Sequence, residues 1–251
     1  MPLDLSGKRA LVTGSSRGIG KAIAEALARA GCRVAVNGRD LARLAETAAG
    51  IPGSIPIPGD MSVPAEAGRV VAAALAALGG LDIVVCNVGG GRSVPPGSET
   101  ANEWQRVFAL NLWSATNTVE AARAALSASR GAIVCVSSIC GLEVVPGAPV
   151  TYSAAKAALH AYVRGIARPL GLQGIRINAV APGNILFDGS VWSRKLAEDA
   201  GAVEAMLKRD VSLGALGKPG DVASLVAFLA SPEAAFATGA VWTLDGGQVK
   251  S

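Results

Sequence analysis

The sequence RALVTGSSRGIGKAIAEALARAG, residues 9–31, contains the pattern that decides the fold. Its first six residues predict a short apolar strand, and its Ala/Leu-rich second half predicts an amphipathic helix. Between these elements lie Gly14, Gly18 and Gly20, in the spacing Gly-x-x-x-Gly-x-Gly. Glycine permits a tight turn and a close approach of the backbone to another group. The stretch therefore predicts a strand, a glycine turn and a helix, the first half of a β-α-β unit.

The rest of the chain repeats this alternation of strand and helix. Further strands are expected at 33–38, 54–60, 81–88, 131–138, 175–183 and 239–247. Further helices are expected at 40–50, 65–80, 101–129, 152–169 and 220–231, with a helix-rich insertion before the last of them. Pro56 and Pro58 suit an edge strand, and Pro169 should end or bend its helix.

Strands that alternate with helices form right-handed crossovers, and these place helices on both faces of a parallel sheet. We therefore predict an α/β fold, a Rossmann-type doubly wound parallel sheet of about seven strands flanked by helices on both faces. Residues 1–251 are expected to form one domain, with a substrate-loop or lid insertion at about 184–212.

The composition limits the classes of function. Of the 251 residues 51% are hydrophobic and 17% are charged, which supplies a large core. The net charge is +4, but the basic residues are scattered, which argues against a nucleic-acid partner. There is no run of eighteen apolar residues and no secretory signal, so no membrane association is expected.

The cysteine and histidine content argues against a metal site. Cys32, Cys86, Cys135 and Cys140 form no Cys-x-x-Cys motif, and His160 is the only histidine, expected to be a packed or surface helix residue. The first three cysteines lie at apolar strand-like runs, which predicts buried, reduced thiols and a cytoplasmic location.

The glycine turn predicts a dinucleotide site, because a helix N-terminus offers unpaired N–H groups to a pyrophosphate. The plain alternative is a strand-to-helix turn with no ligand. Asn37 occupies the position where an acid would favour NAD, and Arg39 and Arg17 suit a 2′-phosphate. Asp40 is the competing acid, but it is better interpreted as the N-cap of the next helix. We predict NADP(H) over NAD(H).

Several further motifs follow the glycine turn in a fixed order. The stretches are TGSSRGIG (13–20), CNVGG (86–90), NLWSATNTVEAA (111–122), VCVSSICG (134–141), YSAAK (152–156), INAVAPGNI (177–185) and TGAVWTLDGG (238–247). In YSAAK, Tyr152 and Lys156 are four residues apart and so lie on one helix face. Together these motifs resemble the short-chain dehydrogenase/reductase family over essentially the whole chain. The branch they resemble is that of single-domain 3-oxoacyl-[acyl-carrier-protein] reductases.

The resemblance implies a catalytic set. Tyr152 would be the general acid/base, and Lys156 would lower the pKa of Tyr152 and bind the nicotinamide ribose. Ser138 would bind the substrate oxygen; Ser137 is a secondary candidate, because one residue is inserted before Tyr152 relative to the common family spacing. Asn111 would complete a proton relay through water and Lys156.

The resemblance also implies a cofactor-binding set that runs along the carboxyl ends of the strands. Its members are Gly14, Ser16, Arg17, Gly18, Ile19, Gly20, Asn37, Arg39, Asp60, Met61, Asn87, Gly89, Tyr152, Lys156, Pro182, Gly183 and Ile185. Asn87 is expected to keep a structural role behind the adenosine half. Phe187 stands where the family often has threonine, so that contact with the cofactor is in doubt.

The predicted function is reversible hydride transfer between NADP(H) and a carbonyl/secondary alcohol pair, with a 3-oxoacyl thioester or another ketone as substrate. Two alternatives remain, a catalytically inactive NADP-binding sensor or scaffold and a structural subunit of a larger reductase. A homotetramer is implied by the resemblance, with a dimer as the alternative.

The substrate is expected to lie between three segments, 90–94, 139–145 and 184–192. Apolar side chains in the last two would form most of the wall: Leu142, Val144, Val145, Leu186, Phe187, Val191 and Trp192. Arg92 and Arg194 could meet an anionic group, although a surface position is the simpler expectation for both.

Overall fold

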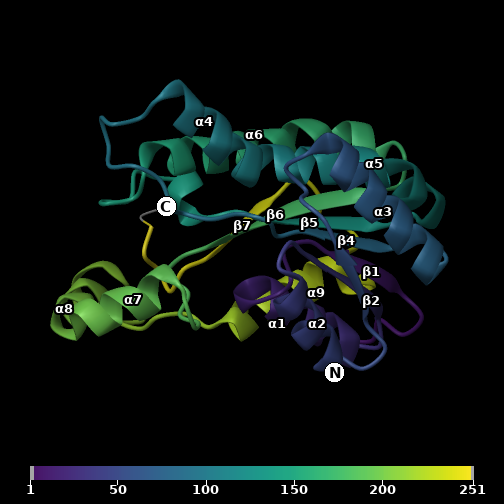
Figure 1. The fold of residues 1–251 in the computed structure, drawn as a ribbon, viewed down its shortest axis with the longest axis horizontal. Helices are drawn as coiled ribbons and strands as arrows, with labels where there is room; N and C mark the ends of the chain where they lie inside the picture. Colours follow the sequence, from purple (N-terminus) through teal and green to yellow (C-terminus); the bar gives the residue numbers. More distant parts are fainter. Residues whose placement is uncertain (1–2, 250–251) are drawn as a thin grey trace.

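The computed structural model describes residues 3–249, and its centre is a parallel sheet of seven strands in the order β3-β2-β1-β4-β5-β6-β7 (Figure 1). The strands are β1 (Arg9–Val12), β2 (Arg33–Gly38), β3 (Ile55–Pro58), β4 (Ile83–Cys86), β5 (Ala132–Val136), β6 (Arg176–Pro182) and β7 (Val241–Leu244). The strand count and the parallel arrangement confirm the predicted fold class. The weak proline-containing strand, β3, lies at an edge of the sheet as expected.

Helices cover both faces of the sheet, as Figure 1 shows. The helices are α1 (Gly18–Arg29), α2 (Leu41–Ala49), α3 (Pro64–Leu78), α4 (Ala101–Phe108), α5 (Ser114–Ser129), α6 (Val150–Gly171), α7 (Val191–Glu198), α8 (Ala200–Asp210) and α9 (Pro219–Ala230). Short turns are η1 (Ala109–Trp113), η2 (Ile139–Gly141) and η3 (Pro232–Ala234). Helices α1, α2 and α9 lie on one face and α3, α4, α5 and α6 on the other, whereas α7 and α8 project at one end of the molecule.

Alternating side chains of the strands supply the two layers of the core. In β1, Leu11 packs under α3, α5 and α6, while Ala10 and Val12 pack under α1 and α9. All three side chains are fully buried. The predicted burial of Cys32, Cys86 and Cys135 is confirmed. Because both faces are covered, the strands are nearly continuous apolar runs.

Strand β1 pairs with β2 on one side and with β4 on the other, so the strand order reverses beside it. Ligands of doubly wound folds bind at the carboxyl ends of the strands at such a reversal. The glycine turn follows β1 directly. The topology therefore places the predicted cofactor turn at the expected binding edge.

Two helices differ from the sequence-based expectation. The helical region 101–129 is continuous but contains one π-helical turn, η1, between α4 and α5. Helix α6 begins at Val150 and continues for two residues beyond Pro169, so the proline lies within the last turn. The proline lacks the N–H that would bond to Gly165 O, but the residues after it keep theirs, so the helix continues for two residues.

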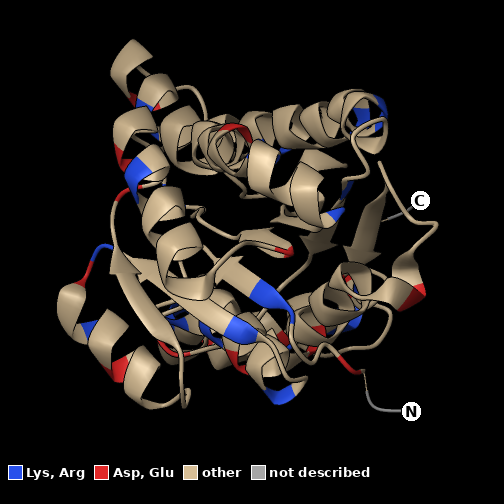
Figure 2. Ribbon diagram, turned by 90° about the vertical axis from the view of Figure 1, so that its right-hand side faces the viewer, with Lys and Arg blue, Asp and Glu red and all other residues tan. Residues whose placement is uncertain are grey.

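The charged residues do not gather on one face in the view of Figure 2, where basic and acidic positions are interspersed over several elements. Within residues 3–249, none of the helices combines the length and the apolar character needed to cross a membrane.

Candidate active site

A cavity of about 880 Å³ opens at the carboxyl edge of the sheet. The glycine turn, the ends of β2, β4, β5 and β6, the start of α6 and the insertion with α7 and α8 line it. All predicted site residues line this cavity except Gly18 and Asn111. The cavity therefore brings together predicted site residues that are up to 171 positions apart in the sequence, from Gly14 to Ile185.

Two asparagines hold the glycine turn against the neighbouring strands. The Nδ2 of Asn87 donates to the carbonyl oxygens of Thr13 (3.0 Å) and Gly14 (2.9 Å). This geometry agrees with the structural role expected for Asn87. The Nδ2 of Asn37 donates to Ile57 O (3.0 Å) and Gly59 O (3.1 Å), and its Oδ1 accepts from Gly14 N (3.3 Å). The amide of Asn37 is thus engaged by backbone groups, and its contact with the cofactor stays a prediction.

The first turn of α1 has the features of an anion site. Arg17 at the N-cap makes no side-chain capping bond, and the first turn carries no acidic residue. A Cβ at Gly20 would collide with the Asn87 amide and with the carbonyl oxygen of Gly14. The turn thus leaves N–H groups uncapped by side chains and requires glycine for its close packing, so the residues present fit a dinucleotide phosphate.

Phe187 from the insertion packs over the glycine turn. A Cβ at Gly18 would lie 2.6 Å from Cε2 of the Phe187 ring, and Gly18 has a positive φ of 56°. This ring covers Gly18 and explains why Gly18 does not line the cavity. Phe187 therefore ties the insertion to the turn.

Arg39 and Asp60 form an ion pair at the adenosine end of the cavity, with Nη1 and Oδ2 2.9 Å apart. Burial raises the pKa of Asp60, but hydrogen bonds from Ser62 and the pairing with Arg39 outweigh it, so the pKa is lowered. Asp40 accepts a bond from Arg43 N (3.2 Å) and caps α2, which confirms its predicted role. The Asp40 carboxylate is thus engaged at the start of α2, by the backbone and the side chain of Arg43.

Tyr152 and Lys156 lie on the first turns of α6. The Lys156 Nζ is 5.8 Å from the centre of the Tyr152 ring and donates to Val136 O at 3.0 Å. Burial raises the pKa of Tyr152 to about 12, although a hydrogen bond with Ser138 opposes this. Burial also lowers the pKa of Lys156 to about 8.

The pKa of Tyr152 is thus raised, whereas the resemblance implies a lowered one, and the shift comes from burial, Ser138 and Cys140 rather than from Lys156. Both groups are removed from water, and this disfavours the charged form of each. The stabilisation of a tyrosinate by Lys156 stays a prediction. Tyr152 is therefore a protonated phenol at neutral pH.

Ser138 rather than Ser137 contacts the tyrosine. Ser138 lies at the end of β5, where its Oγ accepts from Cys140 N (3.2 Å) and interacts with Tyr152. Ser137 also lines the cavity, but its buried Oγ has no partner among the residues that the structure describes. Ser138 therefore occupies the predicted position beside the tyrosine.

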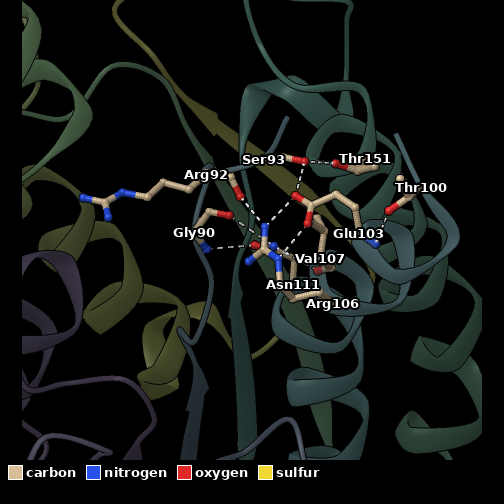
Figure 3. A network of polar contacts seen from close by, with 9 residues as sticks. All are labelled: Gly90, Arg92, Ser93, Thr100, Glu103, Arg106, Val107, Asn111 and Thr151. Carbon is tan, nitrogen blue, oxygen red and sulfur yellow. Dashed lines mark hydrogen bonds and ion pairs between the residues drawn. The ribbon is translucent and has the colours of Figure 1, made fainter. Parts of the chain in front are cut away.

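Asn111 lies behind the cavity wall, in the π-helical turn η1 (Figure 3). Its Oδ1 accepts from Gly90 N (2.9 Å), and its Nδ2 donates to Gly90 O (3.2 Å) and Val107 O (3.0 Å). A Cβ at Gly89 would lie 3.0 Å from Asn111 Oδ1 and 3.1 Å from Lys156 Nζ, so both groups approach this glycine. The water-mediated relay stays a prediction.

A hydrogen-bonded chain next to Tyr152, which sequence reasoning missed, joins three segments (Figure 3). The Ser93 Oγ lies 2.7 Å from Glu103 Oε1 and 2.6 Å from the Oγ1 of fully buried Thr151. Interactions with Arg106 and Ser93 lower the pKa of Glu103 to about 2, so this ionised carboxylate only accepts. Ser93 must donate its single proton to Glu103, and Thr151 must then donate to Ser93.

The Glu103–Arg106 pair also holds the backbone of this segment. The Arg106 Nη2 lies 2.6 Å from Glu103 Oε1 and donates to Arg92 O at 2.9 Å. We call the four side chains of Ser93, Glu103, Arg106 and Thr151 the clamp. Only the spacing of Glu103 and Arg106 on one helix could have been found in the sequence, because the other partners are brought together by the fold.

The predicted apolar wall is only partly confirmed. Val145, Phe187, Val191 and Trp192 line the cavity. Leu142 and Val144 instead line a smaller open groove of about 350 Å³ beside η2, and Leu186 lines neither. Among residues 3–249 there is no group of three His, Cys, Asp or Glu side chains that could hold a metal ion.

Comparisons with known proteins agree with this geometry. Residues 14–248 match the family model described as enoyl-(acyl carrier protein) reductase. The chain is 33% identical to the rhamnolipids biosynthesis 3-oxoacyl-[acyl-carrier-protein] reductase of Pseudomonas aeruginosa, over 97% of each protein.

Solved structures give the same result. The crystal structure of L-sorbose reductase from Gluconobacter frateurii with NADPH and L-sorbose is similar with a TM-score of 0.93, at 28% identity and over 100% of both chains. A 7α-hydroxysteroid dehydrogenase with NADH and 7-oxoglycochenodeoxycholic acid is similar with a TM-score of 0.91, at 29% identity, over 100% of this chain and 97% of that one.

Proposed function

The chain belongs to the short-chain dehydrogenase/reductase family, and on this premise we propose that it is an NADP(H)-dependent oxidoreductase that interconverts a ketone and a secondary alcohol. The observation that carries the proposal is the placement of Ser138, Tyr152 and Lys156 in the same cavity as the uncapped glycine turn. A turn that only connected a strand to a helix would not need to face these three side chains.

The side chains of the cavity divide the work of the reaction. When bound, the nicotinamide supplies the hydride that adds to the carbonyl carbon, or accepts it in the reverse direction. Tyr152 donates the phenolic proton to the carbonyl oxygen during reduction, which completes the alcohol, and then regains a proton from solvent. Ser138 donates a hydrogen bond to the same oxygen and orients it, and a protonated Lys156 stabilises the tyrosinate that is left.

The test of this proposal is Tyr152→Phe, assayed with a panel of ketones and NADPH. Removal of the general acid should lower turnover about 10²- to 10⁴-fold, while the binding constant for NADP changes little. Tyr162→Phe is the matched control, because Tyr162 lies on α6 but does not line the cavity. Near-normal turnover of Tyr152→Phe would refute the mechanism.

The preference for NADP(H) rests on two arginines at the adenosine end. Arg17 has no side-chain partner among the described residues, and Arg39 is held at the cavity by Asp60. A 2′-phosphate would accept charge-assisted bonds from both guanidinium groups. Two similar structures contain different cofactors, NADPH in one and NADH in the other, so fold similarity does not decide between them.

Cofactor choice is measured from the KM for NADPH and for NADH. We expect a clear preference for NADPH in the wild-type protein. Arg39→Gln should reduce the ratio of the two kcat/KM values about tenfold, because one charge-assisted bond to the phosphate is lost. Equal use of both cofactors before mutation, or an effect of the variant on NADH alone, would contradict the proposal.

The substrate is proposed to be a 3-oxoacyl thioester or another ketone, since one relative is a 3-oxoacyl-[acyl-carrier-protein] reductase and another is an L-sorbose reductase. The homotetramer and the cytoplasmic location implied by the sequence stay predictions.

A further inference from the structure

The cationic side chains that line the cavity fall into two groups. Four of them have partners: Arg39 pairs with Asp60, Lys156 donates to Val136 O, Lys195 lies over the Trp192 ring, and Arg209 pairs with Asp210. Arg17, Arg92 and Arg194 have no side-chain hydrogen bond or ion pair with any residue in the range 3–249. The two acidic residues of the lining, Asp60 and Asp210, are both among the partners of the first group. The unpaired charge of the cavity is therefore positive.

Arg17 belongs to the glycine turn and is accounted for by the proposed cofactor site. Arg92 and Arg194 come from other segments, the loop after β4 and the second turn of α7. The cavity lining thus includes two unpaired guanidinium groups that the cofactor turn does not contain.

The position of Arg92 is fixed relative to the catalytic tyrosine. A Cβ at the preceding Gly91 would lie 3.9 Å from Cζ of Tyr152. The Arg92 carbonyl accepts from Arg106 (2.9 Å), and the following residue, Ser93, is bonded to Glu103 and Thr151. Figure 3 shows that the Arg92 side chain extends away from this clamp, on the side opposite to Glu103 and Thr151. The clamp therefore fixes the backbone from which Arg92 projects, one residue from the glycine that approaches the tyrosine.

Arg194 reaches the same cavity from the insertion. Helix α7 is capped by Ser190, whose Oγ accepts from Ser193 N at 3.0 Å and which itself lines the cavity. Arg194 follows one turn later and shares the lining with Val191 and Trp192. Two segments that are about a hundred residues apart thus each supply an unpaired arginine.

We propose that the substrate carries an anionic group, a carboxylate or a phosphate, which Arg92 and Arg194 bind while its carbonyl lies at Tyr152. The inference rests on the proposed function and narrows its substrate class to charged ketones. Guanidinium groups form two parallel hydrogen bonds with both kinds of anion. Positive charge at the mouth of the cavity also attracts an anion before binding, which raises its rate of association.

The experiment compares two matched pairs of ketones with NADPH. Acetoacetate and its methyl ester form the carboxylate arm, and dihydroxyacetone phosphate and dihydroxyacetone form the phosphate arm. The anion of at least one pair should have a kcat/KM about tenfold above that of its neutral partner. This advantage should fall as salt is raised, since the two arginines are exposed.

Arg92→Gln and Arg194→Gln should each lower the kcat/KM for the anion about tenfold and leave that for the neutral partner unchanged. Arg164→Gln is the control, because Arg164 is exposed on α6 and does not line the cavity. An equal effect on charged and neutral ketones overturns the inference. A rise in the KM for NADPH with Arg194→Gln also overturns it, because Arg194 would then contact the cofactor.

Calorimetry with the NADP-loaded Tyr152→Phe protein separates this inference from the proposed function. If an anion binds and Arg92→Gln weakens that binding, the inference is supported, even when no ketone is turned over. Absence of turnover would refute the proposed function alone. Turnover without any preference for charge upholds the function and overturns the inference. Failure of both anions, acetoacetate and dihydroxyacetone phosphate, to show arginine-dependent binding overturns it as well.

Discussion

Two parts of the cavity lining differ in what their polar side chains contact: the glycine turn, which we call the first wall, and the loop after β4 with helix α7, which we call the second wall. At the glycine turn, the side-chain amides of Asn37 and Asn87 donate to backbone carbonyl oxygens, so the turn is held rigid. In the second wall, the guanidinium groups of Arg92 and Arg194 have no hydrogen bond or ion pair with any described residue. In the first wall the backbone is preorganised to bind a ligand through its N–H groups. In the second wall the guanidinium charges are not neutralised by the protein, so a ligand can neutralise them.

The largest effect is expected where the rigid wall is broken. In Gly20→Ala the new methyl group would lie 2.9 Å from Ser15 Cα and would collide with Asn87, so the turn must shift. We expect NADP binding to weaken more than about tenfold and the free energy of unfolding to fall by about 1–3 kcal/mol. Calorimetry and urea unfolding measure the two quantities.

Gly68→Ala is the matched control for this variant, because a Cβ at Gly68 in α3 meets nothing within 4 Å. It should stabilise the helix by about 0.5–1 kcal/mol and leave NADP binding unchanged. Equal behaviour of the two variants would show that the close packing at Gly20 has no role in the turn.

An intermediate effect is expected from the buried side chain of Lys156. The pKa of Lys156 is about 8 in the folded protein and 10.5 as its ordinary value, so the unfolded chain binds more protons between these pH values. The free energy of unfolding contributed by this group therefore rises with pH from about 8 to 10.5. Lys156→Met should lack that rise. The tyrosines and thiols titrate in both proteins, so the difference between the wild-type and variant curves of unfolding free energy against pH isolates the contribution of Lys156.

The difference should amount to about 2 kcal/mol between about pH 8 and pH 10 for the ligand-free protein, measured by urea unfolding at each pH. Parallel curves for the two proteins would show that Lys156 keeps its ordinary pKa in the fold.

The smallest effect is expected at the clamp that supports the second wall. Ser93→Ala leaves the fully buried Thr151 hydroxyl without its acceptor, which should lower the free energy of unfolding by about 1–2 kcal/mol. In Ser93→Ala/Thr151→Val no hydroxyl is left unpaired, so part of this loss should be recovered. Ser224→Ala, at an exposed serine of α9, serves as the control and should change stability by less than about 0.5 kcal/mol. Strict additivity of the two single changes would argue against the chain of hydrogen bonds.

The sequence predicts those parts of the fold that depend on local pattern. Seven apolar runs correspond to the seven strands, and the N-cap role of Asp40 followed from its position at a helix start. The structural role of Asn87 was implied by the family resemblance, and its bonds to the glycine turn agree with it. The candidate catalytic residues were chosen through the motif order of the family they resemble, and the structure places Ser138, Tyr152 and Lys156 in one cavity.

What the sequence could not predict depends on contacts between distant segments. Neither the packing of Phe187 on Gly18 nor the bond between Ser93 and Thr151 has a signal in residue spacing. The direction of the Tyr152 pKa was predicted wrongly because proximity to Lys156 was visible in the sequence and the degree of burial was not. The charge of the cavity could not be predicted for the same reason, since only the fold shows which arginines are left unpaired.

The π-helical turn has a consequence for what can occupy position 111. Through its acceptor and donor, the Asn111 carboxamide faces both the N–H and the C=O of Gly90, as a peptide group of a neighbouring strand would. The side chain thus acts as a surrogate backbone that continues strand-like pairing in the loop beyond the end of β4. Aspartate has the same shape but no donor, and its second oxygen would face the Gly90 carbonyl. Position 111 therefore requires a side chain that both donates and accepts a hydrogen bond, as a peptide group does, and not only one of the right size and polarity.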